Sequence, residues 1–385
     1  MGYTYLIVGS GMQGTACAFD LLRSPGTEEV LLADSSVAGL DAARRRLKSR
    51  RLKTVRADAS DLRRVRALAK GRAVLVSAVP YYFNLGLAKA AVDAKVHHVD
   101  LGGNTDIVLQ ELALSSKAKA AGVTLIPDVG LGPGMTNTIA VEAMGRLDEV
   151  SEVLIRDGGL PQEPAPPMDY LLTFSEHGLI NEYVEDATAL RGGRRVKVPG
   201  LSEMEDLILP GLGRMEAAHA SGGLSTMAWT YQGKVRSMDN KLIRYPGHIA
   251  VINAMRAMGF FRTAPMDLGG AKVAPRTLSA RLFREAFHHP GEKDFVVIRV
   301  TARGRKDGRR AEAVYDGMDR YDEKEKMTAM MRTTGFPASI VAQMLASGFI
   351  AKPGAYPVET AVPPGPFLDE MRRRGLKLRW KMRTL

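Results

Sequence analysis

The stretch Leu6-Ile7-Val8-Gly9-Ser10-Gly11-Met12-Gln13-Gly14 constrains the fold more than any other part of the sequence. Its three apolar residues predict a strand that is buried on both faces. The G-x-G-x-x-G spacing that follows gives each glycine a physical task. Gly9 permits a tight turn, Gly11 lets the backbone approach a pyrophosphate, and Gly14 lets helix and strand pack closely.

A dinucleotide site is therefore predicted at the start of the first helix. Met12 and Gln13 lie in its first turn, where unpaired N–H groups and the helix dipole bind a pyrophosphate. A second apolar strand, Val30 to Ala33, ends at Asp34, twenty positions after Gly14. An acidic residue at this position accepts hydrogen bonds from the ribose hydroxyls and would repel a 2′-phosphate, which favours NAD over NADP. Ser35, Ser36 and nearby arginines leave NADP as the less favoured alternative.

Four more apolar runs, separated by helical patterns, predict a Rossmann-type doubly wound parallel sheet, an α/β fold, over residues 1–130. The additional strands are expected at 53–56, 73–77, 97–101 and 123–127, and the helices at 37–47, 63–69, 85–94 and 106–121.

Polar and glycine-rich segments follow these strands at the sheet edge where open α/β sheets bind ligands. Ala78, Val79 and Pro80 follow the fourth strand and are expected to pass beside the cofactor. Tyr81 in the same loop, and Gly102 and Gly103 after the fifth strand, are candidate substrate-binding residues. Asp58 follows the third strand; it either borders an adenine pocket or caps the helix that begins near Asp61.

A helix is expected up to about Met144, and from Val150 the pattern changes to strands that alternate with turns, which predicts an α+β domain with a mostly antiparallel sheet over 131–330. Strands are expected near 153–156, 170–174, 215–218 and 226–231, with a hairpin at Gly192-Gly193. A longer hairpin, 295–301 with 311–315, turns at Asp307-Gly308. Helices are expected at 249–258 and 278–287. The remaining segment, 331–385, is predicted to be helical and to return to the Rossmann domain.

The bulk composition is that of a soluble globular protein: the chain has 385 residues, a single cysteine (Cys17) and a net charge of +12. The basic residues are scattered among acids and lack interleaved aromatics, so a nucleic-acid partner is not expected. There is no secretory signal and no apolar run long enough to cross a membrane, so a cytoplasmic location is expected.

Two later clusters carry side chains able to do chemistry. The first is His219 followed by Ala-Ser-Gly-Gly, and the second is Lys241-Leu-Ile-Arg244-Tyr245-Pro-Gly-His248. Arg244 could bind a carboxylate with two parallel hydrogen bonds, and Lys241, Tyr245 or a histidine could transfer a proton. The alternative is a strand end with solvated basic side chains and a capped helix.

No metal site is expected. His97 and His98 are adjacent and must point to opposite faces of a strand, and His288 and His289 present the same difficulty. The sequence contains no C-x-x-C, H-E-x-x-H, G-x-S-x-G or Walker A motif.

Several motifs in this order resemble the saccharopine dehydrogenase superfamily, and within it the L-lysine 6-dehydrogenases. They are Gly9 to Gly14, Asp100-Leu-Gly-Gly103, Ile126-Pro-Asp128 leading into Gly132-Pro-Gly-Met135, His219 to Gly223, and Ile243 to His248. The glycine fingerprint is generic, whereas the later motifs are more specific. Saccharopine-forming enzymes carry an acidic residue before the Pro-Gly pair, where this chain has Gly132, and this difference weakens the saccharopine alternative.

The resemblance implies NAD-dependent oxidative deamination of the lysine ε-amino group, giving a semialdehyde that cyclises to a piperideine carboxylate. It also implies a homodimer or higher homo-oligomer, built through the sheet of the second domain. Asp128, His219, Lys241 or Tyr245 would transfer the protons, and Arg244 and His248 would bind the amino-acid substrate. The alternatives are a saccharopine dehydrogenase or reductase and, from another class, a non-catalytic NAD-binding sensor or a basic protein associated with nucleic acid.

Overall fold

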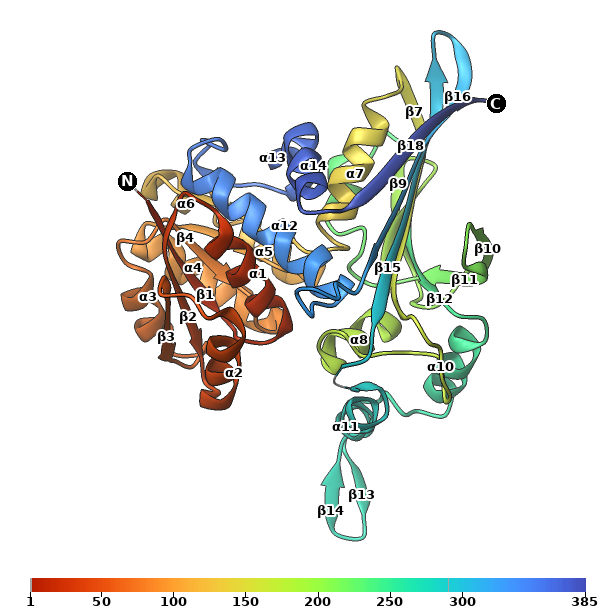
Figure 1. Ribbon diagram of the computed structural model, residues 1–385. Coiled ribbons are helices and arrows are strands. Elements are labelled where there is room, and N and C mark those ends of the chain that lie inside the picture. Colours follow the sequence, from red (N-terminus) through yellow and green to blue (C-terminus); the bar gives the residue numbers. More distant parts are fainter. Residues whose placement is uncertain (1, 290) are drawn as a thin grey trace. The chain divides into compact units, whose positions relative to one another are not determined.

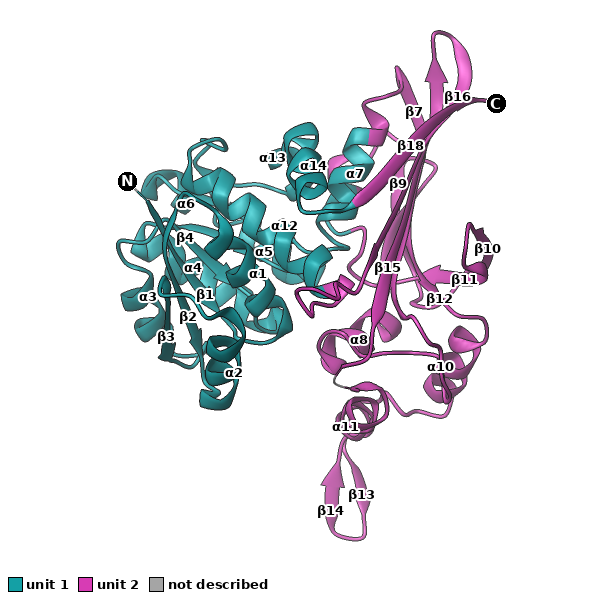
Figure 2. Cartoon of the chain, viewed as in Figure 1, with its two compact units in different colours: residues 1–142, 225–227, 331–376 teal, residues 143–224, 228–330, 377–385 magenta. Residues whose placement is uncertain are grey.

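The computed structural model describes residues 2–289 and 291–385, which form two compact units (Figures 1 and 2). Unit 1 comprises residues 1–142, 225–227 and 331–376, and unit 2 comprises 143–224, 228–330 and 377–385. The sequence-based boundaries were 1–130, 131–330 and 331–385. The compact units differ from them because residues 131–142 and a three-residue segment at 225–227 group with unit 1, whereas 377–385 belongs to unit 2.

Unit 1 is built on a parallel sheet with seven strands in the part of the chain that is described, in the order β17-β6-β5-β4-β1-β2-β3. The predicted doubly wound α/β fold is confirmed, since β1 lies centrally and the order reverses beside it. The strands are β1 (Tyr3–Val8), β2 (Thr27–Asp34), β3 (Leu52–Arg56), β4 (Val74–Ser77), β5 (His97–Asp100), β6 (Thr124–Ile126) and β17 (Gly354–Ala355). The short edge strand β17 was not predicted.

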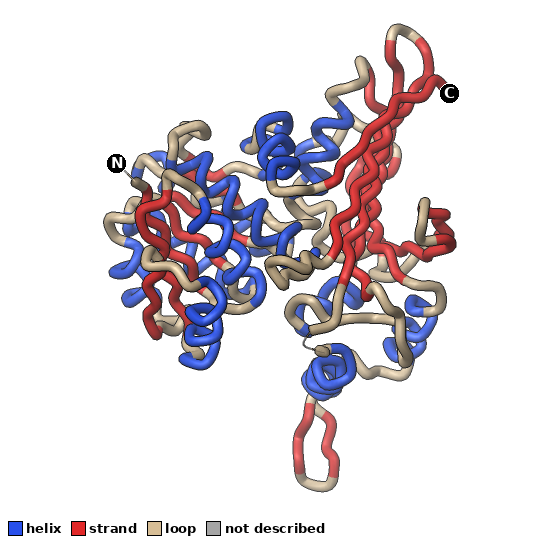
Figure 3. Tube along the Cα trace, viewed as in Figure 1, coloured by secondary structure: helices blue, strands red, loops and turns tan. Residues whose placement is uncertain are grey.

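Helices cover both faces of this sheet, as the colouring in Figure 3 makes clear. The helices that lie wholly or mostly in unit 1 are α1 (Met12–Arg23), α2 (Val37–Leu47), α3 (Leu62–Ala69), α4 (Asn84–Ala94), α5 (Thr105–Leu112), α6 (Ser115–Ala121), α7 (Met135–Met144), α12 (Ala329–Ala346), α13 (Val358–Ala361) and α14 (Pro364–Arg373), with the 3-10 turn η1 (Tyr81–Phe83). The single helix predicted over 106–121 is divided into α5 and α6. The Ser115 hydroxyl at this division accepts a hydrogen bond from the backbone N–H of Ala355 in β17.

Helices α1 and α12 pack closely because Gly335 carries no side chain. A Cβ atom at Gly335 would lie 2.6 Å from Cβ of Ala16, 2.8 Å from the Gln13 carbonyl oxygen and 2.9 Å from the Cys17 nitrogen. Cys17 itself is fully buried, and burial raises the pKa of its thiol.

Replacing Gly335 by alanine is expected to lower the free energy of unfolding by about 1–3 kcal/mol, because overpacking displaces one helix from the other. Urea denaturation followed by circular dichroism measures this change. Gly365→Ala in α14 is the matched control, since its Cβ would meet no atom within 4 Å. Equal stability of the two variants would contradict the close α1–α12 contact.

Unit 2 contains a mixed sheet of nine strands among the described residues, in the order β10-β11-β12-β7-β15-β16-β18, with β8 pairing β12 and β9. The predicted mostly antiparallel sheet is confirmed, since β7 and β12 form the parallel pair among antiparallel neighbours. The strands are β7 (Glu149–Pro161), β8 (Ala187–Arg191), β9 (Arg194–Val198), β10 (Glu205–Leu209), β11 (Gly213–His219), β12 (Ser237–Arg244), β15 (Asp294–Lys306), β16 (Arg309–Arg320) and β18 (Lys377–Thr384). A separate hairpin joins β13 (Met266–Leu268) to β14 (Ala271–Val273).

One face of this sheet is covered by α8 (Glu176–Val184), α10 (His248–Ala257) and α11 (Pro275–Phe287), which share a hydrophobic core with Ala218 and Leu242 of the sheet. Two strand predictions are wrong here. Residues 170–174 form a buried loop against these helices, and 226–231 contains the short helix α9 (Met227–Thr230). Both segments are apolar because they are buried, and short apolar runs do not distinguish a strand from a buried loop or helix.

Throughout the residues that the structure covers, 2–289 and 291–385, no helix has the length and apolarity required to span a bilayer.

Candidate functional site

The glycine-rich turn between β1 and α1 has the geometry of a dinucleotide cradle. Gly9 has a φ of +109°, and a Cβ atom there would lie 2.4 Å from the Ala78 carbonyl oxygen. A Cβ atom at Gly14 would lie 1.9 Å from the Gly9 oxygen. Gly11, by contrast, has no atom within 4 Å of its Cβ position. Two glycines thus permit the close backbone packing, and the third leaves space above the turn.

This space lies at the start of α1, where no side chain caps the helix. The helix N-terminus therefore presents backbone donors and a positive dipole end to the space beside Gly11, the arrangement that suits a pyrophosphate. Ala78 and Val79 pack against the turn: Cβ of Ala78 lies 3.2 Å from a Cβ built at Gly14, and Cγ1 of Val79 lies 3.1 Å from one built at Gly9. The residues present fit a dinucleotide.

Asp34 is fixed at the end of β2 beside the same turn. One carboxylate oxygen accepts hydrogen bonds from the Ser10 backbone nitrogen at 2.6 Å and from the Ser10 hydroxyl at 2.9 Å. The other accepts from the Ser36 nitrogen at 2.8 Å. Each oxygen has two acceptor sites, so the second one retains capacity for a ribose hydroxyl.

Asp58 does not cap helix α3, so the capping role considered for it is wrong, and its place beside an adenine pocket stays a prediction. Its exposed carboxylate accepts hydrogen bonds from the backbone and hydroxyl of Ser60, which lower its pKa. The cap of α3 is Asp61, whose oxygen accepts from the Arg64 nitrogen at 3.0 Å. Asp58 thus closes the turn that precedes the cap.

Four predicted residues gather at the carboxyl ends of β4, β5 and β6. A Cβ atom at Gly103 would lie 3.4 Å from Cβ of Tyr81, and one at Gly102 would lie 2.0 Å from Oδ1 of Asp128. Pro80 directly precedes η1, in which Tyr81 is the first residue. Asp128 has a φ of +64°, is fully buried, and accepts a hydrogen bond from the Ser225 hydroxyl. Burial, followed by the charge of Asp100, raises the pKa of Asp128 well above its usual value.

Arg244 forms the centre of a second group, within unit 2. Its side chain is buried, and the guanidinium carbon lies 5.0 Å from the ring centroid of Tyr170 and 5.6 Å from that of Tyr183. Its Nε donates to the Tyr183 hydroxyl at 3.0 Å, and Nη1 donates to the Ile243 carbonyl. Glu182 lies 4.0 Å from Nη2.

His248 extends this hydrogen-bond network, and its contacts fix which ring nitrogen carries the proton. Its Nδ1 lies 3.1 Å from the Met168 carbonyl oxygen, which can only accept, so Nδ1 carries the proton. Burial and then the charge of Arg244 lower the pKa of His248 to about 3. The ring is therefore neutral at pH 7, and Nε2 accepts from the Tyr183 hydroxyl at 2.8 Å. Arg244, Tyr183 and His248 form a donor-to-acceptor chain in which each role is fixed.

Stability should decline on acidification partly because of His248. In the unfolded chain the His248 imidazole takes up a proton near pH 6.5, whereas in the folded protein it does so only near pH 3. Between these values each pH unit removes up to about 1.4 kcal/mol from the free energy of unfolding. His248→Asn should show a shallower dependence between pH 6.5 and 4 in urea titrations. The exposed His177→Asn serves as control, and parallel curves for wild type and His248→Asn would refute this assignment.

His219 and Lys241 do not join the Arg244 group, because side chains alternate along β12 and Lys241 points to the opposite face of the sheet from Arg244. Lys241 is paired in register with His219 on β11. Its Nζ donates to the Glu203 carbonyl at 2.6 Å and bonds Glu205 at 3.2 Å. His219 lies 3.1 Å from Glu203, and burial lowers its pKa. The second predicted cluster is thus divided: Lys241 lies with His219 on one face of the sheet, whereas Arg244 and His248 form a separate group.

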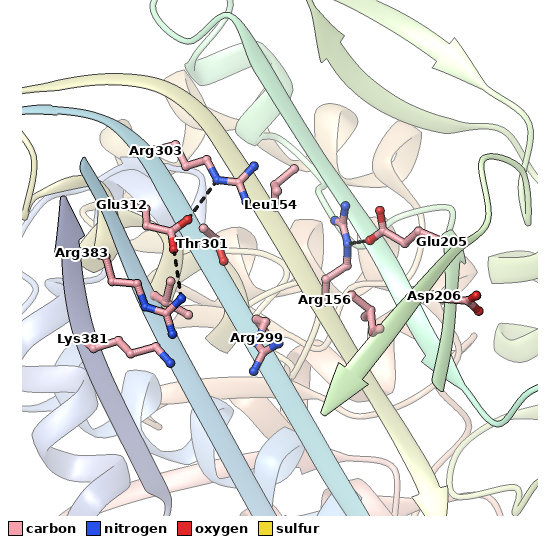
Figure 4. A pocket seen from close by; sticks show the side chains of 12 residues that line it. Leu154, Arg156, Glu205, Asp206, Arg299, Thr301, Arg303, Glu312, Lys381 and Arg383 are labelled. Atoms are coloured by element: carbon pink, nitrogen blue, oxygen red, sulfur yellow. Dashed lines mark hydrogen bonds and ion pairs between the residues drawn. The ribbon is translucent and has the colours of Figure 1, made fainter. Parts of the chain in front are cut away.

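The face that carries Lys241 also contains a groove of about 400 Å³ lined mainly by charged side chains (Figure 4). Arg156 bonds Glu205 at one side, and Arg303 bonds Glu312 at the other. Tyr245 lies half-buried beside an apolar cluster, and its hydroxyl donates to the Pro161 carbonyl at 3.0 Å. Its pKa is raised by burial. The three proton-transfer candidates of unit 2, His219, Lys241 and Tyr245, are therefore held in contacts away from Arg244.

Sequence reasoning missed the partners of Arg244. Asp157 accepts from the Asn240 amide at 2.8 Å, and Arg244 lowers its pKa although burial dominates and raises it to about 6. Burial raises the pKa of Glu182 to about 8. The acidic residue directly before Gly158-Gly159 was a usable signal, since glycines inside a strand mark close approaches, and a Cβ atom at Gly158 would lie 2.4 Å from the Ile243 carbonyl oxygen. Tyr170, Tyr183 and Glu182 carry no local signal.

Comparisons with known proteins cover nearly the whole chain. Residues 5–126 match the profile described as saccharopine dehydrogenase NADP binding domain, and residues 130–376 match the saccharopine dehydrogenase C-terminal domain. Carboxynorspermidine synthase of Vibrio cholerae is 25% identical over 79% of this chain and 76% of its own length. Carboxyaminopropylagmatine dehydrogenase of Synechocystis is 24% identical over 96% of both chains. Mouse mitochondrial alpha-aminoadipic semialdehyde synthase is 21% identical over 81% of this chain, which spans 41% of that longer protein.

Solved structures show the same fold. The apo saccharopine dehydrogenase (L-Glu forming) from Saccharomyces cerevisiae superimposes with a TM-score of 0.79 at 18% identity, with both chains fully covered. The homospermidine synthase of Legionella pneumophila, solved in complex with NAD, gives a TM-score of 0.69 at 12% identity over 99% of this chain and 91% of its own. The two matched profiles, the parallel sheet with its glycine turn and the second mixed sheet together show that the chain belongs to the saccharopine dehydrogenase family of nicotinamide-dependent oxidoreductases.

Proposed function

We propose that this protein is an NAD-dependent dehydrogenase that oxidatively deaminates the ε-amino group of L-lysine. The product semialdehyde would cyclise to a piperideine carboxylate. The observation that carries the proposal is the buried Arg244 of unit 2, whose guanidinium lies against the rings of Tyr170 and Tyr183 and 4.0 Å from Glu182. Asp157 on β7 is aligned with Leu242 on β12, two residues from Arg244, so the side chains of Asp157 and Arg244 lie on one face of the sheet. Burial raises the pKa of Asp157, and the charge of Arg244 opposes this rise. Such a pair complements the carboxylate and the ammonium group of an α-amino acid.

The glycine turn and Asp34 support the choice of cofactor. When bound, the nicotinamide accepts a hydride from the amine-bearing carbon of the substrate. A carboxylate anchored by Ser10 and Ser36 at the end of β2 accepts ribose hydroxyls and repels the additional phosphate of NADP. We therefore propose NAD as the preferred cofactor.

Tyr81, Gly102, Gly103 and Asp128 are proposed to border the reacting end of the substrate in unit 1. Asp128 stays the candidate for proton handling on its placement beside Gly102 and Ser225. The glycines leave room for a ligand next to the chain, because no side chain projects from positions 102 and 103. His248 is proposed to act by fixing the Tyr183 hydroxyl that holds Arg244.

A second candidate function is oxidation or formation of a secondary amine that joins an amine to an amino-acid or keto-acid carbon, as in saccharopine. The names of two relatives, carboxynorspermidine synthase and carboxyaminopropylagmatine dehydrogenase, favour this alternative. The Arg244–Asp157 pair would bind an amino-acid head group in either reaction.

A panel of amino acids and amines with NAD and with NADP, monitored at 340 nm for reduced nicotinamide, separates these functions. Turnover of L-lysine alone supports lysine deamination. A kcat/KM with NAD at least about tenfold above that with NADP supports NAD as the preferred cofactor. Turnover only of saccharopine, or of glutamate with the semialdehyde in reverse, supports the second function. Binding of NAD without turnover of any amine would contradict both and indicate a sensor.

We further propose a homodimer in solution. Sedimentation equilibrium of the purified chain is expected to give twice the mass of 41.8 kDa. A monomer at micromolar concentration would contradict the proposal.

A further inference from the structure

A buried cluster in unit 1, formed by His98, Asp100 and Glu111, has the composition of a metal site. His98 and Asp100 are two positions apart on β5 and share one face of the sheet, and Glu111 lies on α5. The Nε2 atom of His98 lies 3.7 Å from Oδ2 of Asp100 and 3.7 Å from Oε1 of Glu111. All three side chains are at most 1% exposed. The sequence expectation of no metal considered His97 with His98, whereas the assembled group pairs His98 with Asp100 and Glu111.

Five buried nitrogen and oxygen atoms of the three side chains make no hydrogen bond of ordinary geometry, although His98 lies near the backbone of Leu75 and Glu111 near Asp100. They are Nδ1 and Nε2 of His98, Oδ2 of Asp100, and both carboxyl oxygens of Glu111. The other oxygen of Asp100 accepts from the backbone nitrogens of Gly102 at 2.7 Å and Asp128 at 3.2 Å. A buried polar atom that remains unsatisfied costs about 1–3 kcal/mol, so a cluster of them needs an explanation.

Protons alone satisfy the cluster only in part. One proton shared by Asp100 and Glu111 would satisfy that pair of carboxyl groups. It would leave Nε2 of His98 without a partner, since 3.7 Å is too long for a hydrogen bond. A cation among the three side chains would satisfy Nε2 and both carboxylates together.

The electrostatic surroundings also favour a cation. A further buried carboxyl group, that of Asp128, lies beside the cluster, because the backbone nitrogen of Asp128 donates to Oδ1 of Asp100 at 3.2 Å. Buried carboxylates in proteins are generally paired or coordinate metal ions.

We propose that His98, Asp100 and Glu111 bind a first-row divalent transition-metal ion, with Zn²⁺ as the best match. An imidazole with two carboxylates suits zinc, manganese or iron, whereas magnesium and calcium prefer oxygen ligands alone. Tetrahedral zinc, with bonds of about 2.0–2.2 Å, places neighbouring ligand atoms roughly 3.3–3.6 Å apart. The observed 3.7 Å separations are close to this range, and the three ligand atoms all lie within 4.8 Å of one another.

The ion would act as a positioning element. Asp100 would bind it through Oδ2 while Oδ1 holds the backbone of Gly102 and Asp128. Binding would therefore fix helix α5 to β5, together with the loop that carries Gly102 and Gly103. This inference goes beyond the proposed function and does not depend on which amine is the substrate.

Metal analysis of the full-length protein tests the proposal without any activity measurement. Protein stripped with EDTA is dialysed against buffer containing ZnCl₂, CoCl₂ or MgCl₂, and bound metal is counted by mass spectrometry while thermal denaturation is followed. The expected result is one Zn²⁺ or Co²⁺ per chain, a raised Tm, visible Co²⁺ absorption, and no uptake of Mg²⁺. Failure of the wild-type chain to take up Zn²⁺ or Co²⁺ would overturn the proposal.

Substitutions locate the ion. His98→Gln and Glu111→Gln should each weaken Zn²⁺ binding by at least roughly 100-fold, because loss of an outer partner alone costs ~10–100-fold. Asp294→Asn, which changes a buried carboxylate of unit 2, is the matched control and should retain one equivalent. In the metal-free protein, Glu111→Gln replaces one of two neighbouring buried carboxyl groups by a neutral amide and should leave stability equal or higher. If both ligand variants still bound one metal ion per chain, the ion would bind elsewhere and this site would be rejected. If the variants fail to fold, the visible Co²⁺ absorption of the wild-type chain decides: its presence supports the site and its absence rejects it.

Discussion

Gly11→Ala is expected to raise the Kd for NAD by at least about tenfold, or 1.4 kcal/mol, while the protein remains folded. The backbone at Gly11 has a φ of −66° and a ψ of −171°, which alanine adopts without strain. Its Cβ would meet no protein atom within 4 Å, so packing is not disturbed. The new methyl group would project into the space in which a pyrophosphate must approach the start of α1.

Gly14→Ala is the variant with which Gly11→Ala is compared. A Cβ atom there would lie 1.9 Å from the Gly9 oxygen, so the turn must open before any ligand is present. Gly14→Ala should therefore lower both the Tm and the affinity for NAD, whereas Gly11→Ala should lower the affinity alone. Calorimetric titration with NADH and thermal denaturation of both variants measure the two effects. Unchanged NADH affinity in Gly11→Ala would remove the turn from the cofactor site.

The cradle was predictable because its determinants are local. A strand, three glycines at fixed spacing and an acidic residue at the end of the next strand all lie within 30 residues of sequence, so the register of the sheet did not need to be known. Helix α2 has the predicted bounds, Val37–Leu47, since its apolar spacing and the Ser36 cap are local signals. The edge strands β17 and β18 pair with segments far away in the chain, and nothing in their own sequences indicates those partners.

The substrate cluster was harder to assemble from sequence. Lys241 and Arg244 are close in the chain, yet an odd spacing in a strand puts their side chains on opposite faces. The partners of Arg244 come from β7 and α8, and those of His98 from the same strand and a following helix. Their grouping depends on strand order and helix placement, which only the folded chain specifies. Single buried residues such as Tyr183 carry no signal that separates them from ordinary core residues.

Arg244→Ala is expected to raise the KM for L-lysine at least about tenfold, with kcat less affected, because the guanidinium binds a group that does not react. The buried guanidinium makes two hydrogen bonds, to Tyr183 and Ile243, so that its orientation is fixed before substrate arrives. Its removal would also leave Asp157 buried without its cation, and a lower Tm is expected. Arg244→Lys keeps the charge but loses the planar fork, and should lie between wild type and Arg244→Ala.

A substrate without a carboxylate separates binding from loss of structure. For 1,5-diaminopentane, the wild-type enzyme lacks the same interaction, so Arg244→Ala should change kcat/KM much less than it does for L-lysine. Arg256→Ala is the matched control in unit 2, because its guanidinium also donates to a backbone carbonyl, that of Gly200, and to Asn253. It should reduce stability and leave the KM for L-lysine unchanged. If Arg244→Ala affected both amines equally, Arg244 would be a structural residue, and the carboxylate of the substrate would have to be bound by another cation.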